Sequence, residues 1–201
     1  MNKNTSKKPL NLILLGDPAS GKVTQAARLV AKYHFYDFDM GRELRKPAVR
    51  ARYDFVRTNA AGKLTPTWLV RDIYLRTIPA VPRKQGILFD GTPKMIGEAK
   101  LVARLLKQNG RSDPLVLYLS VPRSETVKRA RKRREYVRGK LVKRSDDEER
   151  AIRNRWRYYE AQVSRVKAFF KKKYTFKKIS GMGTRAEVWA RIAAALRRYD
   201  S

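Results

Sequence analysis

The sequence predicts an α/β fold in which a parallel β-sheet carries helices on both faces. Short apolar runs of strand length recur along the whole chain, at residues 10–15, 34–38, 86–89, 115–119 and 174–179. Segments with apolar residues at helical spacing lie between these runs. Such a regular alternation of strand and helix is typical of a parallel sheet joined by crossover helices. We therefore expect one domain over residues 10–199, with five strands at its core.

The N-terminal segment and two of the helices have the clearest local sequence patterns. Residues 1–9 are polar and predict a loose tail before the first strand. Two helices begin with capping boxes, Ser145 with Glu148 and Thr184 with Glu187. Their apolar faces are Ile152, Trp156, Tyr159, Val163, Val166 and Phe170 in the first, and Trp189, Ile192, Leu196 and Tyr199 in the second. Both helices are expected to pack one face on the core.

Two stretches fit the alternation poorly. One is a helical region between the second and third strands, at about residues 39–82, and the other is a short basic segment at about residues 135–145. Neither has the length or pattern of a simple crossover. We expect both to be insertions that move as lids.

Composition excludes several classes of protein. The 201 residues and 23.3 kDa fit a single domain, and 42% hydrophobic residues suffice for a core. The chain has no cysteine, so it has no disulfide, no thiolate nucleophile and no cysteine-ligated zinc. The apolar run near the N-terminus is too short for a signal peptide or a membrane span. We expect a soluble, cytoplasmic protein.

The charge balance indicates a polyanionic ligand or partner. Forty-eight Lys and Arg residues against 18 Asp and Glu give a net charge of +30 and a pI near 10.9. Nucleic acid, an acidic membrane or a small phosphorylated ligand would each fit this charge, and so would a general basic bias of the surface. Composition does not choose among them.

A phosphate-binding loop follows the first strand. Its sequence is Gly16-Asp17-Pro18-Ala19-Ser20-Gly21-Lys22-Val23-Thr24. Glycines let the backbone wrap round a phosphate, the start of the next helix supplies N–H groups, and Lys22 adds a positive charge. The strict pattern places Ser or Thr directly after the Lys, whereas here Val23 precedes Thr24. The strand, loop and helix together predict a nucleotide site.

A carboxylate ends the third strand, within the segment Ile87-Leu88-Phe89-Asp90-Gly91. Open α/β sheets bind ligands at this edge, beyond the carboxyl ends of their strands. Beside a phosphate-binding loop, Asp90 is placed to hold Mg²⁺ through its water shell.

Four ordered segments resemble the adenylate kinase family. Residues 16–24 resemble its phosphate-binding loop, and residues 40–45, 62–66 and 90–94 resemble its Thr-Gly-Asp-Met-Leu-Arg, Gly-x-Leu-Val-x-Asp and Asp-Gly-Phe-Pro-Arg segments. Arg129 and Arg133 match the paired arginines before the lid, and residues 144–147 with Arg155 match the Arg-x-Asp-Asp…Arg stretch. The resemblance covers residue 10 to about residue 199. It implies a P-loop nucleoside monophosphate kinase with a short lid that carries no zinc.

The resemblance also implies the reaction and the residues that perform it. The reaction is reversible transfer of the γ-phosphoryl group from MgATP to AMP, a task of positioning and charge neutralisation. Lys22, Arg133, Arg144, Arg155 and Asp90 would be catalytic. ATP would be held by Gly16, Pro18, Ala19, Ser20, Gly21, Lys22, Val23, Thr24, Arg129 and Arg133. The acceptor would be held by Met40, Gly41, Arg45, Leu64, Gly91, Lys94, Glu98, Arg144 and Arg155. Thr24 and, through water, Asp90 would hold Mg²⁺.

Two departures from the family pattern concern the acceptor. Lys94 replaces the usual Arg, so a point charge replaces a planar fork at the acceptor phosphate. Glu98 replaces a Gln that reads the acceptor adenine, and a carboxylate suits the N1 and N2 hydrogens of guanine. AMP remains the leading acceptor, with GMP, CMP and UMP as alternatives, and we expect a monomer.

A different function is the alternative that the charge suggests. The basic run at residues 128–134 and the three lysines at residues 171–173 are dense enough to bind RNA or DNA. A basic P-loop protein that binds nucleic acid would explain them. No motif with stacking aromatic residues accompanies the run, and it coincides with arginines that phosphoryl transfer needs.

Overall fold

A computed structural model describes residues 8–51, 53, 65–132, 134–137, 140–143 and 149–197, and for residues 132–159 the backbone alone where it is described. The predicted capping box of Ser145 and Glu148 lies outside the described residues, as do Arg133, Arg144, Leu64 and Tyr199. In the part of the chain that is described, no helix combines the length and the apolar character needed to cross a membrane.

The centre of the molecule is a sheet of five parallel strands in the order β2-β3-β1-β4-β7. These strands are β1 (Leu12–Gly16), β2 (Tyr36–Asp39), β3 (Ile87–Asp90), β4 (Leu115–Ser120) and β7 (Phe176–Ser180). Within the sheet, Gly16 pairs with Leu119 and Asp39 pairs with Asp90, so the carboxyl ends of β1, β2, β3 and β4 lie along one edge. The predicted fold class and its strands are confirmed.

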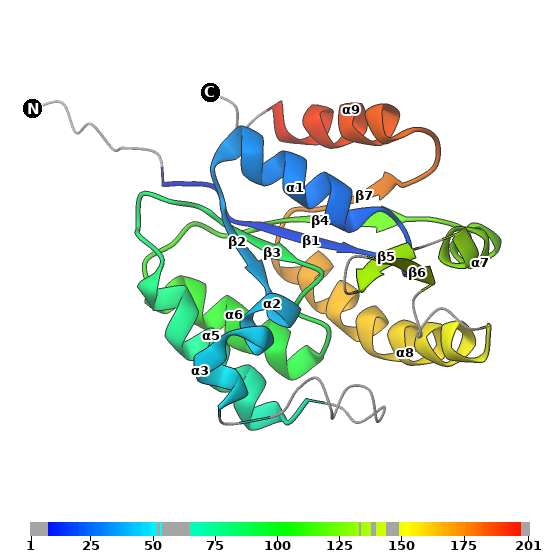
Figure 1. Cartoon of the computed structure of the whole chain (residues 1–201). Coiled ribbons are helices and arrows are strands. Elements are labelled where there is room, and N and C mark those ends of the chain that lie inside the picture. The colour runs from blue at the N-terminus through cyan, green and yellow to red at the C-terminus, as the bar shows by residue number, and fades with distance from the viewer. Residues whose placement is uncertain are drawn as a thin grey trace, which may run out of the picture.

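Helices cover both faces of this sheet (Figure 1). The helices α1 (Lys22–Tyr33) and α9 (Arg185–Leu196) lie on one face. The helices α5 (Thr67–Ala80), α6 (Ile96–Gln108) and α8 (Glu149–Lys173) lie on the other. The strand side chains alternate between the two faces, because successive residues of a strand point to opposite sides. Leu12 and Leu14 pack with α1 and α9, whereas Ile13 and Leu15 pack with the other three helices.

The predicted apolar faces of α8 and α9 pack on the core through the side chains that the structure describes. In α8, Val163, Val166 and Phe170 are buried, and the side chains of Ile152, Trp156 and Tyr159 lie outside the description. In α9, Ile192 and Leu196 are buried, while Trp189 is partly buried against the same core. The Thr184 hydroxyl accepts from the Glu187 N–H at 3.2 Å, and Glu187 Oε2 accepts from the Thr184 N–H at 2.7 Å, which confirms this capping box.

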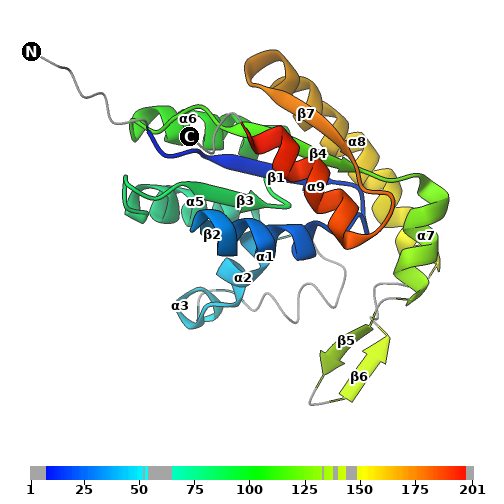
Figure 2. The same ribbon diagram turned by 90° about the horizontal axis from the view of Figure 1, so that it is seen from above.

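The two stretches that fit the alternation poorly contain further elements. The helices α2 (Met40–Arg45) and α3 (Pro47–Arg50) follow β2, and α5 contributes Leu69, Tyr74 and Ile78 to the main core. After α7 (Arg123–Lys132), the strands β5 (Arg134–Val137) and β6 (Lys140–Lys143) form an antiparallel pair. Figure 2 shows this pair beyond α7, away from the five-stranded sheet. That these stretches move as lids stays a prediction.

Candidate functional site

The loop between β1 and α1 has a backbone that is shaped to face an anion. Ala19 and Gly21 have positive φ angles of 56° and 89°, and Gly21 caps α1 with no side-chain hydrogen bond. A helix start without a side-chain cap offers its first N–H groups to a ligand. Gly16 is required for a separate reason, because a Cβ there would lie 2.6 Å from the Leu119 carbonyl oxygen. The loop thus lies directly against β4.

The Lys22 side chain folds back onto the start of this loop. Its ammonium donates to the carbonyl oxygens of Gly16 at 2.5 Å and of Asp17 at 2.9 Å. Its Cε is also 3.7 Å from the position that a Cβ on Gly91 would take. The Lys22 side chain therefore lies between the phosphate-binding loop and the turn that follows β3.

Asp17 fastens the loop to β4, a role that sequence reasoning missed. The Asp17 carboxylate is buried, with one oxygen accepting from the Tyr118 hydroxyl and the other from the Val121 N–H at 2.9 Å. The Asp17 N–H in turn donates to the Leu119 carbonyl at 2.9 Å. The partners are about a hundred residues away in the sequence, so their pairing leaves no local signal there.

Thr126 of α7 also contacts the loop, through a hydroxyl that donates to the Pro18 carbonyl at 3.1 Å. Arg129 lies one turn further along α7 and pairs with Glu125 at 2.6 Å. This pair holds the guanidinium that the sequence assigns to the donor base. Arg155 lies in α8 and its side chain is outside the description, while Arg133 and Arg144 are outside the described residues. The structure therefore does not test whether these arginines converge.

Asp90 is a crowded carboxylate at the end of β3. Burial is the main factor that raises the pKa of Asp90 to about 6, the nearby carboxylates of Asp39 and Asp37 raise it further, and Lys22 and Lys94 lower it. A carboxylate with anionic neighbours gains from a nearby divalent cation. The Thr24 hydroxyl belongs to the first turn of α1. The described residues contain no group of three or more His, Cys, Asp or Glu side chains that could hold a metal ion. The carboxylate and hydroxyl oxygens of Asp90 and Thr24 are ligands of the kind that Mg²⁺ takes alongside water and phosphate.

The predicted acceptor residues lie on α2 and after β3. Asp39 caps α2, accepting from the Arg42 N–H at 2.6 Å. The Arg45 guanidinium lies over the start of the same helix, 3.4 Å from the place of a Cβ on Gly41. Met40 is partly buried against the core, whereas Arg45 and Lys94 are exposed, so both cations are accessible to a ligand. Leu64 lies outside the described residues.

Glu98 has a structural task at the start of α6. Its Oε2 accepts from the N–H groups of Lys94 at 2.8 Å and of Met95 at 3.4 Å, which caps the helix. Burial raises the pKa of Glu98, and these hydrogen bonds lower it. The cap uses one carboxylate oxygen. The predicted role in reading the acceptor base would have to use the other.

A buried hydrogen bond links α5 to the turn after β3. The hydroxyl groups of Tyr74 and Thr92 are hydrogen-bonded, and both residues are buried. The Tyr74 ring stacks on Phe38 of β2 with 5.1 Å between ring centroids. Tyr74 therefore joins α5 to β2 and to the turn after β3. Sequence reasoning missed this pair because Thr92 replaces an apolar residue in the matched segment and Tyr74 carries no motif.

Comparison with known proteins points to one family. Residues 14–175 match the family model described as adenylate kinase. An adenylate kinase of Phocaeicola vulgatus is 30% identical over 193 residues, which cover 94% of this chain and 99% of the relative. One of Porphyromonas gingivalis is 31% identical over 194 residues, covering 94% and 97% of the two chains. An adenylate kinase of Thermus thermophilus is 31% identical over 188 residues, which cover 92% of this chain and 96% of the relative.

Proposed function

The chain belongs to the adenylate kinase family, and from this premise we propose that it transfers the γ-phosphoryl group of ATP reversibly to AMP, giving two molecules of ADP. One observation carries the proposal for this chain's own residues. Lys22 reaches from the phosphate-binding loop to the turn after Asp90, so a loop for the donor phosphates and a carboxylate for their metal lie side by side. The enzyme is a phosphotransferase.

The loop would hold the ATP phosphates through backbone N–H groups from Gly21 into the first turn of α1 and through the positive end of that helix. The Lys22 ammonium now bonded to the Gly16 and Asp17 carbonyls would turn to the transferred group. Phosphoryl transfer spreads negative charge over the equatorial oxygens, and a fixed ammonium stabilises that charge most when water is excluded. Asp17, Tyr118 and Thr126 would keep the loop in its shape during the reaction.

Asp90 and Thr24 are the residues that would hold Mg²⁺, Asp90 through water. When bound, this ion neutralises charge on the β- and γ-phosphate oxygens. Asp90 must be ionised for that task, and with a pKa of about 6 it is largely ionised at neutral pH. Arg129, in its pair with Glu125, would stack on the donor base.

The acceptor would bind between α2 and the turn after β3, where Arg45 and Lys94 are exposed. Arg144 in the lid at about residues 135–145, Arg133 before the lid and Arg155 after it would close over the transferring group. Closure of that lid and of the insertion at residues 39–82 would exclude water and prevent hydrolysis of ATP.

The test is a substrate panel with purified protein. MgATP is mixed with AMP, GMP, CMP or UMP, and the diphosphates are separated by chromatography. We expect the fastest transfer with AMP and a loss of roughly 10²-fold to 10³-fold in kcat for Lys22→Ala. Lys100→Ala, on the exposed side of α6, is the matched control and should retain activity. Absence of transfer to all four acceptors by a folded protein that binds ATP would overturn the proposal.

Two further parts of the proposal come from the sequence. We propose a monomer, because the reaction as derived needs no residue of a second copy, and a cytoplasmic enzyme. Light scattering coupled to gel filtration tests the first, and fractionation of the source cells tests the second.

A further inference from the structure

Five lysines gather where α8 ends and β7 begins. Lys171, Lys172 and Lys173 form the last turn of α8, Lys167 lies one turn before them, and Lys178 lies in β7. We call these five residues the lysine cluster. Every member except Lys167, which is half-buried, is exposed. Among the described side chains, no ion pair with a carboxylate neutralises any of the five.

Aromatic rings lie beneath three of these lysines. The ammonium of Lys167 is 4.5 Å from the ring centroid of Tyr118, that of Lys171 is 5.5 Å from Phe176, and that of Lys173 is 5.6 Å from Tyr174. These cation–π contacts hold the charges near the surface without cancelling them. The cluster is therefore a positive surface of defined geometry.

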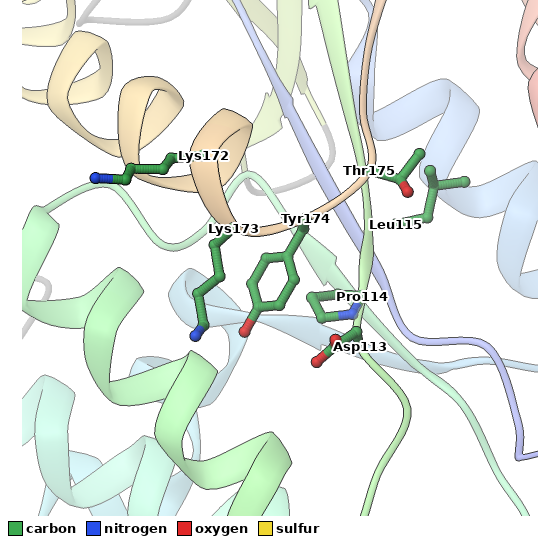
Figure 3. A pocket seen from close by; sticks show the side chains of 7 residues that line it. All are labelled: Asp113, Pro114, Leu115, Lys172, Lys173, Tyr174 and Thr175. Carbon is green, nitrogen blue, oxygen red and sulfur yellow. The ribbon is translucent and has the colours of Figure 1, made fainter.

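A cleft of about 450 Å³ opens beside the cluster (Figure 3). It is lined by Asp113, Pro114, Leu115, Lys172, Lys173, Tyr174 and Thr175. The Tyr174 ring and the Lys173 side chain run along one side of it, and Asp113 lies across from them. Burial, with the Asp113 carboxylate adding to it, raises the pKa of Tyr174 to about 12, so its phenol keeps its proton at neutral pH. The cleft thus offers a hydroxyl donor, a carboxylate acceptor and a cation, the Lys173 ammonium, which lies over the Tyr174 ring, while Phe170 packs against the same ring at 5.9 Å between centroids.

The cleft lies at the opposite end of the strands from the nucleotide site. Leu115 is the first residue of β4 and pairs with Leu12, whereas the phosphate-binding loop begins at Gly16 at the other end of β1. The cleft therefore opens at the amino ends of the strands, and the nucleotide site lies at their carboxyl ends. The proposed kinase reaction uses no residue of the cleft and none of the four exposed lysines. Lys167 lies over the ring of Tyr118, whose hydroxyl bonds to Asp17 of the loop, so the variants below leave Lys167 in place.

We propose that the lysine cluster and this cleft bind single-stranded nucleic acid. Phosphates would lie on Lys171, Lys172 and Lys178. One base would take the place of the Lys173 ammonium over the Tyr174 ring, with Lys173 turning to a phosphate and Asp113 accepting from a base amino group. Positive grooves with ring platforms are how proteins bind single strands. A duplex would fit the lysines but not the cleft, because its bases are already stacked and paired.

A membrane surface is a poorer match for this face. The large apolar side chains that are exposed in the described residues are Val23, Trp68, Leu75 and Met182. None of them belongs to the cluster or the cleft. Peripheral membrane binding usually needs an apolar anchor beside the basic residues.

Binding is tested with the full chain and a labelled single-stranded RNA of mixed sequence, about 15 nucleotides long, titrated at several salt concentrations. The variant K171Q/K172Q/K173Q removes three charges of the cluster. K100Q/R104Q/K107Q removes three exposed charges from α6 and is matched in net charge. We expect the plot of log K against log salt to become shallower by about 2 for the cluster variant and to change little for the control.

The cleft is tested through Tyr174. Tyr174→Phe keeps the ring and should bind nearly as the natural protein does, whereas Tyr174→Leu should weaken binding about tenfold, the order of one lost stacking contact. Thermal unfolding and phosphoryl transfer to AMP are measured on every variant, and both should stay unchanged for the lysine variants. If Tyr174→Leu fails to fold, the lysine variants still decide the outcome.

Three results would overturn the proposal. Equal weakening of RNA binding by the cluster variant and the α6 variant would show that binding depends only on the net charge of the protein. Equal competition by duplex RNA or heparin would show that the cleft takes no base. Binding to vesicles of anionic lipid with none to RNA would assign the face to a membrane. Because transfer is measured separately with Lys22→Ala as its own control, these results leave the kinase proposal untouched.

Discussion

The carboxylate of Asp17, within the phosphate-binding loop, accepts a hydrogen bond from the hydroxyl of Tyr118 in β4. Both groups are buried, and the second Asp17 oxygen accepts from the Val121 N–H at 2.9 Å. The loop that we propose binds phosphate is therefore held from behind by a buried side chain. Such a support fixes the N–H groups before ATP arrives, so less conformational entropy is lost on binding.

Tyr118→Phe should weaken ATP binding and destabilise the fold. The change removes one of the donors to a buried carboxylate, and hydrogen bonds to charged groups contribute roughly 1.5–3 kcal/mol. We expect urea denaturation to show a loss of that order and KM for ATP to rise more than KM for AMP. Tyr174→Phe makes the same chemical change at the far edge of the sheet and is the control. Equal KM values for both substrates in Tyr118→Phe would contradict the supporting role.

A second prediction concerns the buried bond between Tyr74 and Thr92. Tyr74→Phe and Thr92→Val each remove one hydroxyl and leave the other without its partner, which costs about 1–3 kcal/mol. In the double variant both hydroxyls are gone, so the total loss should be smaller than the sum of the single losses. A double-mutant cycle in urea measures this coupling. Additive losses would show that the two hydroxyls do not depend on each other.

The raised pKa of Asp90 predicts that both stability and activity depend on pH. Its folded-state pKa of about 6 lies above the ordinary value of 3.8 for an aspartate, so the folded state binds this proton more tightly than the unfolded state. The contribution of Asp90 to stability is therefore full below about pH 4 and is lost as the pH rises through 6. Activity should run the opposite way, because the carboxylate that would hold Mg²⁺ through water is protonated below pH 6.

Asp90→Asn separates these two effects. The amide carries no charge to desolvate, so at pH 7.5 the variant should melt at a higher temperature than the natural protein, and the difference should shrink at pH 5. Its phosphoryl transfer should be low at both pH values. Aspartate at position 113 is exposed, and Asp113→Asn serves as the control for a lost negative charge. A lower melting temperature for Asp90→Asn at pH 7.5 would mean that Asp90 stabilises the fold as an anion.

The sequence predicted β1, β3 and β4 well because each is a short apolar run that both faces of the sheet bury. The edge strands β2 and β7 carry charged residues and are only partly buried, so their signal is weaker. The sequence predicted the phosphate-binding loop because glycine spacing and Lys22 are local features. It could not show that Tyr74 of the insertion belongs to the main core, since α5 packs through side chains whose partners lie in β2 and beyond β3. The supports of the loop were hidden for the same reason, as Asp17 and Tyr118 meet only through the pairing of β1 with β4.

The sequence assigned Glu98 a role in recognising the acceptor base, and the structure shows that Glu98 also caps α6. Glu98→Gln keeps an oxygen that can accept from the Lys94 and Met95 N–H groups, so the cap survives and stability should change by less than about 1 kcal/mol. Glu98→Ala removes the cap and should cost about 1 kcal/mol. Comparing the free energies of unfolding of the two variants separates the contribution of the helix cap from that of the Glu98 charge.

The acceptor preference follows from which hydrogen bonds each side chain can make. A carboxylate only accepts, which suits the N1 and N2 hydrogens of guanine, whereas the amide of Gln also donates and suits the N1 of adenine. If Glu98 contacts the base, Glu98→Gln should raise the ratio of kcat/KM for AMP to that for GMP, by about tenfold for one hydrogen bond at the base. Glu187→Gln alters the equivalent capping residue of α9, remote from the acceptor segments, and should leave the ratio unchanged. An unchanged ratio in both variants would restrict Glu98 to its cap, and selection of the acceptor base would then have to come from other residues.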